Sequence, residues 1–224
     1  MPPDPPPPPA KPSNLVLESR NSNTLRVRWD AVPDATHYEI EVSWIGQSPL
    51  LFPATLPQNI ESLLPLASNR VHNIRVRALN SGGASNFSDV LFAVTLPPKP
   101  SPPSGTSSII EVNLTLSWEI QLPTNVDMTH PLLVEIRREN DNQIIETNLP
   151  LKGKFSDQPP LGNNGYFVRL FSQINSISPA LRNESEWSDK ASISKNVFAK
   201  MEIPRTQENQ QIRMQLMRRN YGTR

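Results

Sequence analysis

Apolar and polar residues alternate along short stretches in both halves of the chain. The segments "NTLRVRWD" at 23–30 and "VNLTLSWE" at 112–119 place an apolar residue at every second position and end in a Trp followed by an acid. A period of two over this length predicts a strand with one buried face. "HYEIEVSW" at 37–44 and "LLVEIRREN" at 132–140 are predicted to follow as the next strands.

The same landmarks recur in the same order. A third pair of strands is predicted at 72–80 ("HNIRVRALN") and 166–174 ("YFVRLFSQI"), and a Ser-Asp pair precedes a last strand at 88–89 and at 188–189. Four matched landmarks indicate an internal repeat of about 90 to 100 residues. Because helical periodicity is absent from both copies, each copy is predicted to be an antiparallel β-sandwich of roughly seven short strands, and the chain to be all-β.

Two proline clusters mark the predicted domain boundaries. The chain has 25 prolines, which concentrate at 2–12 and at 96–105. Proline lacks the backbone donor that a sheet ladder needs, so the second cluster is predicted to separate two folded units. The predicted organisation is a proline-rich arm at 1–12, a first sandwich at 13–96, a proline-rich linker at 97–103, a second sandwich at 104–199 and a basic tail at 200–224.

The proline-rich arm has three interpretations. Its prolines favour a stiff polyproline II conformation. Such a segment is a solvated tail, a ligand for an SH3-like or WW-like groove, or an arm that orders against a neighbouring subunit. The sequence leaves the three open.

Both predicted sandwiches resemble fibronectin type III domains. In that family a Trp near the end of the second strand packs in the core, a Tyr lies on the third strand, and a tyrosine corner opens the sixth. Trp29 and Tyr38 match in the first copy, where His72 occupies the corner, and Trp118 and Tyr166 match in the second. The resemblance implies two immunoglobulin-like sandwiches in tandem. It also implies that His72 donates a hydrogen bond in place of the corner Tyr.

Composition and the lack of catalytic motifs narrow the function. The net charge is +1, there is no cysteine, and no apolar run approaches the ~20 residues of a membrane helix. The N-terminus does not look like a signal peptide, so we expect a virion or cytoplasmic location. His37, His72 and His130 lack the spacing of metal ligands. We therefore expect no enzyme activity, cofactor, metal, small-molecule substrate or membrane insertion, and we do not expect nucleic-acid binding.

The two copies differ most in two loops. From the Trp to the matching position on the next strand there are nine residues in the first copy, Trp29 to Tyr38, and sixteen in the second, Trp118 to Val134. From the corner residue to the matching Ser, the separation grows from sixteen to twenty-two. Both loops leave the same end of a sandwich, the end predicted to face the linker and the first copy.

These longer loops have two interpretations. They either fill the junction between the two units or form a partner-binding pole, because loops commonly carry binding on rigid scaffolds. Under the second interpretation the candidate partner-contact residues are Asn125, Asp127, Met128, Ile177, Leu181 and Arg182.

The C-terminal tail differs in kind from the rest of the chain. Thr206 is a possible cap for a short helix that carries Ile212 and Leu216 four residues apart, followed by Arg218 and Arg219. A helix this short is marginal alone. The tail is therefore an assembly peptide, a disordered segment or, less favoured, a basic nucleic-acid contact. Further candidate partner-contact residues in it are Ile212, Leu216, Arg218 and Arg219.

The leading function is a non-catalytic structural or adhesion module that docks with protein partners in a larger assembly. Fibronectin-like repeats without cysteine resemble those of bacteriophage tail and virion proteins, so a phage virion component is the first expectation. A cytoplasmic scaffold or adaptor of a eukaryotic assembly is the alternative. An accessory domain pair of an extracellular enzyme is the third possibility.

Overall fold

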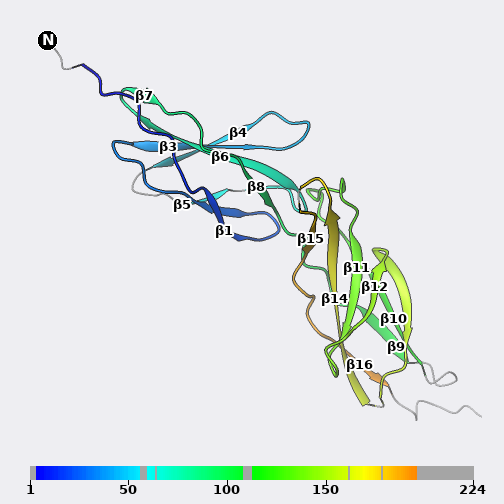
Figure 1. Cartoon of the computed structure of the whole chain (residues 1–224). Coiled ribbons are helices and arrows are strands. Elements are labelled where there is room, and N and C mark those ends of the chain that lie inside the picture. Colours follow the sequence, from blue (N-terminus) through cyan, green and yellow to red (C-terminus); the bar gives the residue numbers. More distant parts are fainter. Residues whose placement is uncertain are drawn as a thin grey trace, which may run out of the picture.

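The computed structural model describes residues 4–55, 60–63, 65–107, 113–160, 162–177 and 179–195. Every regular element in these ranges is a strand, and the strands form two β-sandwiches arranged end to end (Figure 1). The predicted all-β fold with tandem sandwiches is therefore confirmed. The first unit comprises β1 to β8 and the second unit β9 to β16.

In the first unit a three-stranded sheet, ordered β1-β2-β5, faces a five-stranded sheet in which β8 joins the order β4-β3-β6-β7 through β6. All pairings in both sheets are antiparallel. The strands are β1 (Val16–Arg20), β2 (Leu25–Arg28), β3 (His37–Ser43), β4 (Leu50–Thr55), β5 (Ile60–Leu63), β6 (Val71–Asn80), β7 (Gly83–Ala84) and β8 (Leu91–Val94).

Trp29 and Tyr38 lie together in the core of the first unit. Both are fully buried, and their rings meet edge to face at 5.2 Å. The alternation along β3 buries Tyr38, Ile40 and Val42 and turns the residues between them toward the surface. The Tyr38 hydroxyl accepts a hydrogen bond of 2.8 Å from the backbone N–H of Val32, so this side chain joins the core to the turn that precedes its own strand.

The second unit repeats this arrangement. One sheet is ordered β13-β10-β9, and the other is ordered β12-β11-β14-β15, with β16 pairing with β14. The strands are β9 (Ser104–Ser107), β10 (Leu114–Glu119), β11 (Leu133–Arg138), β12 (Ile144–Leu149), β13 (Lys152–Asp157), β14 (Gly162–Ile174), β15 (Leu181–Glu184) and β16 (Ala191–Lys195).

Trp118 packs in the core of the second unit, with 5% of its surface exposed. Its indole N–H donates to the carbonyl of Pro150 at 2.8 Å. Gly153 lies directly against the ring, where an added Cβ would come within 2.6 Å of an indole carbon. Val134, which stands where the first unit has Tyr38, is also fully buried.

The predicted corner at Tyr166 is wrong by two residues. His72 pairs with Ala93 across β6 and β8, and the residue that pairs with the corresponding Ile193 is Asn164. The Asn164 amide donates to the carbonyls of Pro160 and Gly162, both at 3.0 Å, so an Asn ties this corner to the backbone. Matching the two copies by aromatic type displaced the alignment, because only the strand pairing identifies the equivalent position.

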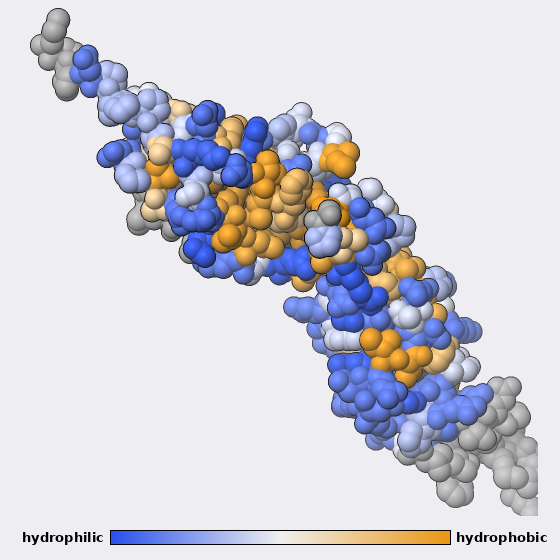
Figure 2. All heavy atoms as spheres, in the orientation of Figure 1, coloured by the Kyte–Doolittle hydropathy of each residue, from blue (hydrophilic) through white to orange (hydrophobic). Residues whose placement is uncertain are grey.

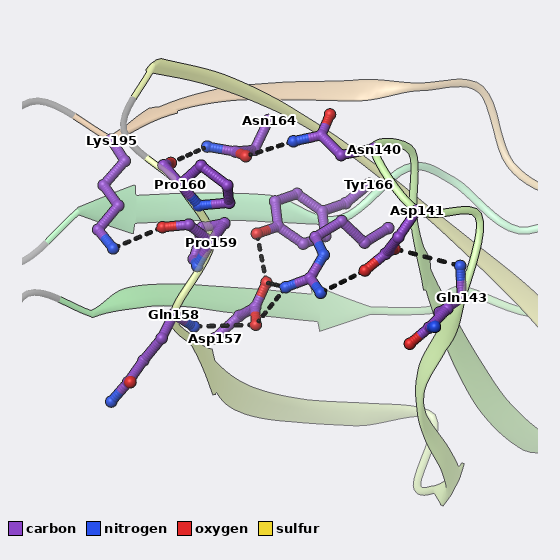
Figure 3. A network of polar contacts seen from close by, with 11 residues as sticks. Asn140, Asp141, Gln143, Asp157, Gln158, Pro159, Pro160, Asn164, Tyr166 and Lys195 are labelled. Carbon is purple, nitrogen blue, oxygen red and sulfur yellow. Dashed lines mark hydrogen bonds and ion pairs between the residues drawn. The ribbon is translucent and has the colours of Figure 1, made fainter.

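Tyr166 instead anchors a buried polar network at the end of the second unit far from the first (Figure 3). Its hydroxyl donates to Asp157 at 2.6 Å, and Arg138 donates to the same carboxylate at 3.0 and 3.1 Å. Burial and the neighbouring carboxylate together raise the pKa of Tyr166. Lys195 closes the network by donating to the Pro159 carbonyl at 2.6 Å. Each of these groups has a partner, so the network is a polar closure of the core.

His72 is buried in the first unit. Its side chain is 1% exposed, and the ring nitrogens lack a partner of good hydrogen-bond geometry among the described residues, although a contact with the Ala67 backbone raises the pKa of His72 against the effect of burial. The ring packs edge-on against Trp44 with the centroids 5.7 Å apart. Burial is the main cause that lowers the pKa of His72 to about 4. The residue is therefore a neutral buried side chain, and its expected role as a corner donor stays a prediction.

Candidate functional site at the junction of the two units

The long loop between β10 and β11 pairs with the first unit through its backbone. The N–H of Ser68 donates to the Asn125 carbonyl at 3.1 Å, and the N–H of Asp127 donates to the Ser68 carbonyl at 2.9 Å. With Val126 these residues form a single parallel β-bridge between the units. This loop therefore fills the junction, as the first interpretation of the longer loops held.

Asn69 lies at the centre of the junction and is fully buried. Its amide nitrogen donates to the carbonyls of Asp127 at 2.9 Å and His130 at 3.0 Å. Its side-chain oxygen accepts from Ser172 at 2.6 Å and from Asn183 at 3.2 Å. One side chain of the first unit is thus hydrogen-bonded to three segments of the second.

Further polar contacts surround this residue. Asn183, also fully buried, donates to the Thr95 carbonyl at 3.0 Å. Arg70 forms an ion pair with Asp127 at 2.8 Å, and the two side chains are 27% and 15% exposed. Burial alone would raise the pKa of Asp127, but hydrogen bonds from Thr129 and Arg70 outweigh burial and lower it. Since buried polar groups without partners are costly, this complementary set fixes how the two units meet.

The loop between β14 and β16 is longer than the sequence comparison indicated. Ser88 binds the N–H of Val76 across 12 residues, and Ser188 binds the N–H of Val168 across 20 residues. These equivalent hydrogen bonds make the second loop longer by eight residues rather than six. Part of the addition forms β15, which carries Asn183 into the junction.

The structure separates the predicted contact residues. Asn125 and Asp127 bind the first unit, and Ile177 lines a groove beside the junction. Leu181 pairs with Ile174 in the sheet. Met128 is 48% exposed. Arg182 binds Glu135 and Glu184 and stacks on Phe171. The candidates in the tail lie outside the described residues; they are Ile212, Leu216, Arg218 and Arg219.

A groove of about 320 Å³ opens beside the junction, lined by both units. Its lining residues are Trp44, Ile45, Gln47, Arg70, Val71, Asn73 and Phe92 from the first unit and Asp127, Thr129, His130, Ser176 and Ile177 from the second. Ile45 is 91% exposed and Phe92 is 61% exposed. Asn73 also lines a second hollow of about 330 Å³ on the outer face of the same sheet, so the two hollows adjoin. Hydrophobic side chains gather over the first unit toward this junction (Figure 2).

The charges around the groove are paired within the protein. Arg70 pairs with Asp127 and lies over the Trp44 ring at 5.4 Å. Arg75 pairs with Glu41 at 2.8 Å, where the second hollow begins. The groove therefore presents aromatic and aliphatic surface together with the neutral amides of Gln47 and Asn73 and the polar side chains of Thr129, His130 and Ser176.

Sequence reasoning did not single out the groove. Ile45 follows Trp44 into a turn and belongs to no alternating pattern, and Phe92 lies in an unbroken apolar run. Pairing of Phe92 with Asn73 shows that its side chain points outward. A signal was present in "SWIGQ" at 43–47, where two large apolar residues run into a glycine turn.

The proline-rich arm packs on its own unit. The Asn80 amide donates to the Pro7 carbonyl at 2.9 Å, and Lys11 pairs with Asp89 at 2.7 Å. Gly82 lies so close that any Cβ there would collide with the Pro6 carbonyl oxygen. Residues 4–8 remain exposed and extend from the end of the first unit that lies away from the second (Figure 1).

No group of three or more His, Cys, Asp or Glu side chains capable of holding a metal occurs among the described residues. Within the same ranges, no helix is long and apolar enough to cross a bilayer.

Comparison with known proteins identifies the first unit. Residues 10–94 match the model of the fibronectin type III domain. The first unit is a fibronectin type III domain. A segment of two fibronectin type III domains from chicken tenascin is 16% identical, with a TM-score of 0.51, and the match covers 82% of this chain and 99% of the tenascin segment. This likeness supports a tandem arrangement of two such folds.

Two further solved structures are similar. One matches most of this chain over part of its own length, and the other matches a smaller part of this chain over most of its own length. The FN1–FN3 domains of chicken CNTN1 are 14% identical with a TM-score of 0.37, and the match covers 84% of this chain and 66% of that segment, just under two thirds. An FN3 domain of human collagen XX is 26% identical with a TM-score of 0.36, and covers 39% of this chain and 91% of that domain. No curated protein matches the chain.

Proposed function

We propose that this chain is a non-catalytic protein-interaction module that binds a protein partner at the groove beside its junction. Fibronectin type III domains are commonly structural or adhesion modules. Within this proposal residues 13–96 and 104–199 are the two folded domains, and residues 97–103 link them. The hydrogen-bonded junction holds the two walls of the groove in one arrangement.

One observation carries the proposal. Ile45 and Phe92 leave most of their surface in water, although they line a groove that is built from both units. An exposed apolar surface gathered around a hollow is typical of a protein-binding site, and a site built on fixed elements orders at little cost.

A photo-crosslinking amino acid in place of Phe92 tests this proposal in the protein's native source. We expect a cross-linked protein at position 92 and none when the same group replaces Ile144, which is 49% exposed on an edge strand of the second unit. Equal cross-linking at the two positions, or none at either, would contradict a partner site at the groove.

A further inference from the structure

We infer that the groove binds the proline-rich arm of a second copy of this chain, which joins copies head to tail. This inference rests on the proposed function, because it names the partner for the same groove.

The surface of the groove selects an uncharged ligand. Arg70 and Asp127 already neutralise each other, so a charged ligand would lose its water without gaining an unpaired partner. The rest of the lining includes the exposed ring of Phe92 and the apolar surface of Ile45. Its hydrogen-bonding groups are the amides of Gln47 and Asn73 and the side chains of Thr129, His130 and Ser176. Aromatic surface flanked by side-chain donors is the chemistry that binds a polyproline II segment, whose rings stack and whose carbonyls accept.

The chain itself carries a segment of this chemistry. Residues 1–9 contain seven prolines and one charged residue, Asp4. Proline has no backbone N–H, so such a segment needs donors from its binding site and offers none itself. Residues 4–8 are exposed, and the part of the arm offered to a second copy is residues 1–5, which precede the Pro6 and Pro7 carbonyls that lie against the first unit. A stiff polyproline segment loses little conformational freedom on binding.

An arm cannot reach the groove of its own molecule. Val71 lines the groove at one end of β6, and Asn80 holds Pro7 at the other end. A strand of ten residues spans roughly 30 Å. Residues 1–6 extended as polyproline II cover only roughly 19 Å, and the arm leaves the first unit in the direction away from the groove (Figure 1). The occupant must therefore come from another copy, and the contact is heterologous.

Sedimentation of the full chain at increasing concentration tests the inference. We expect association into short linear oligomers near millimolar concentration, because so small an interface is weak. Phe92→Asp should weaken association at least about 30-fold, the effect of a central interface residue. Ile144→Asp, the matched exposed control, should change it by less than about two-fold. Identical melting curves for the two variants would show that both remain folded.

A mixing experiment separates head-to-tail contact from other association. Neither the Phe92→Asp chain nor a chain lacking residues 1–6 should associate alone. Their mixture should form a heterodimer and nothing larger, because only one intact arm and one intact groove can meet. A wild-type chain that stays monomeric, or a mixture that stays unassociated, would overturn the inference. A cross-link from position 92 to a different protein, with a monomeric wild type, would overturn it while supporting the proposed function.

Discussion

Asn69 is a buried polar side chain with every hydrogen-bonding group in use. Its amide donates two hydrogen bonds and its oxygen accepts two, all to the second unit. Its backbone φ is 57°, in the left-handed region that Asn tolerates better than most residues. Two features therefore favour Asn at this position: the hydrogen bonds of its side-chain amide and its tolerance of a positive φ.

Replacing Asn69 should loosen the junction without unfolding either sandwich. Asn69→Ala leaves the partners of the amide unpaired, which costs about 1 to 3 kcal/mol, and adds the backbone penalty of a positive φ. Asn69→Gly removes the amide but tolerates the φ. We expect X-ray scattering of both variants to show a broader distribution of distances than the wild type, with Ala the less stable in urea. An unchanged distribution for both would contradict the role of the amide.

His72 should make the first unit sensitive to acid. Its pKa is about 4 in the folded chain and 6.5 ordinarily, so between these values the unfolded chain binds a proton that the folded chain does not. Stability should therefore fall as the pH drops from about 6.5 to about 4, by up to about 3 kcal/mol. Urea unfolding at several pH values measures the slope. His72→Phe should flatten it, and a slope that persists unchanged in this variant would contradict the role of His72.

Residue patterns predicted the cores well and the polar contacts poorly. Alternation predicted that Trp29, Tyr38 and Trp118 are buried, because burial of one strand face has a sequence period. Asn69 has no such period, since its partners come from distant loops. Tyr166 misled because its aromatic type matches a corner that the strand pairing assigns to Asn164.

At the scale of elements, the arm and the hairpin of β6 and β7 form one packed unit. The Asn80 side chain holds the Pro7 carbonyl, and the missing side chain at Gly82 makes room for the Pro6 carbonyl. A proline segment has few backbone donors, so its position depends on such donated bonds and on close approach. The proline content predicted a stiff arm, but not the surface on which it lies, because that surface depends on Asn80 at the end of β6 and on Gly82 in the turn that follows.

Gly82→Ala should release the arm from the hairpin. The added methyl group occupies the position of the Pro6 carbonyl, so one of the two must move. We expect NMR relaxation measurements to show greater mobility of the Ala10 and Lys11 backbone amides. The melting temperature of the first unit should change little. Ser81→Ala, in the same turn, serves as the control. An arm that stays as ordered as in the wild type would contradict this packing.

At the scale of the whole molecule, the two sandwiches behave as one elongated body (Figure 1). Backbone hydrogen bonds between Ser68 and the loop of Asn125 and Asp127 continue the sheet-like pairing from one unit to the other. Loop length alone placed the lengthened loops beside the linker, but it left open whether they fill the junction or form a partner-binding pole. It did not predict the groove, which exists only where surfaces of both units meet.

Replacing residues 124–129 with a short Gly-Ser turn should convert the rigid pair into a flexible one. The change removes the β-bridge, the partner of Arg70 and one acceptor of Asn69, while both hydrophobic cores remain. We expect small-angle scattering to change from one elongated arrangement to a broad ensemble. Both melting transitions should persist. A distance distribution that matches the wild type would contradict a junction held by this loop.

Asn183 begins the triplet Asn-Glu-Ser, the acceptor sequence for an N-linked glycan. The nitrogen that a glycan would occupy is the one that donates to Thr95 and Asn69, in a position without access to solvent. A glycan on Asn183 and the hydrogen-bonded junction therefore cannot be present in the same molecule. In a chain made in a glycosylating secretory host, a glycan at this triplet would keep the two units apart. The same chain made in a bacterial cytoplasm would form the hydrogen-bonded junction.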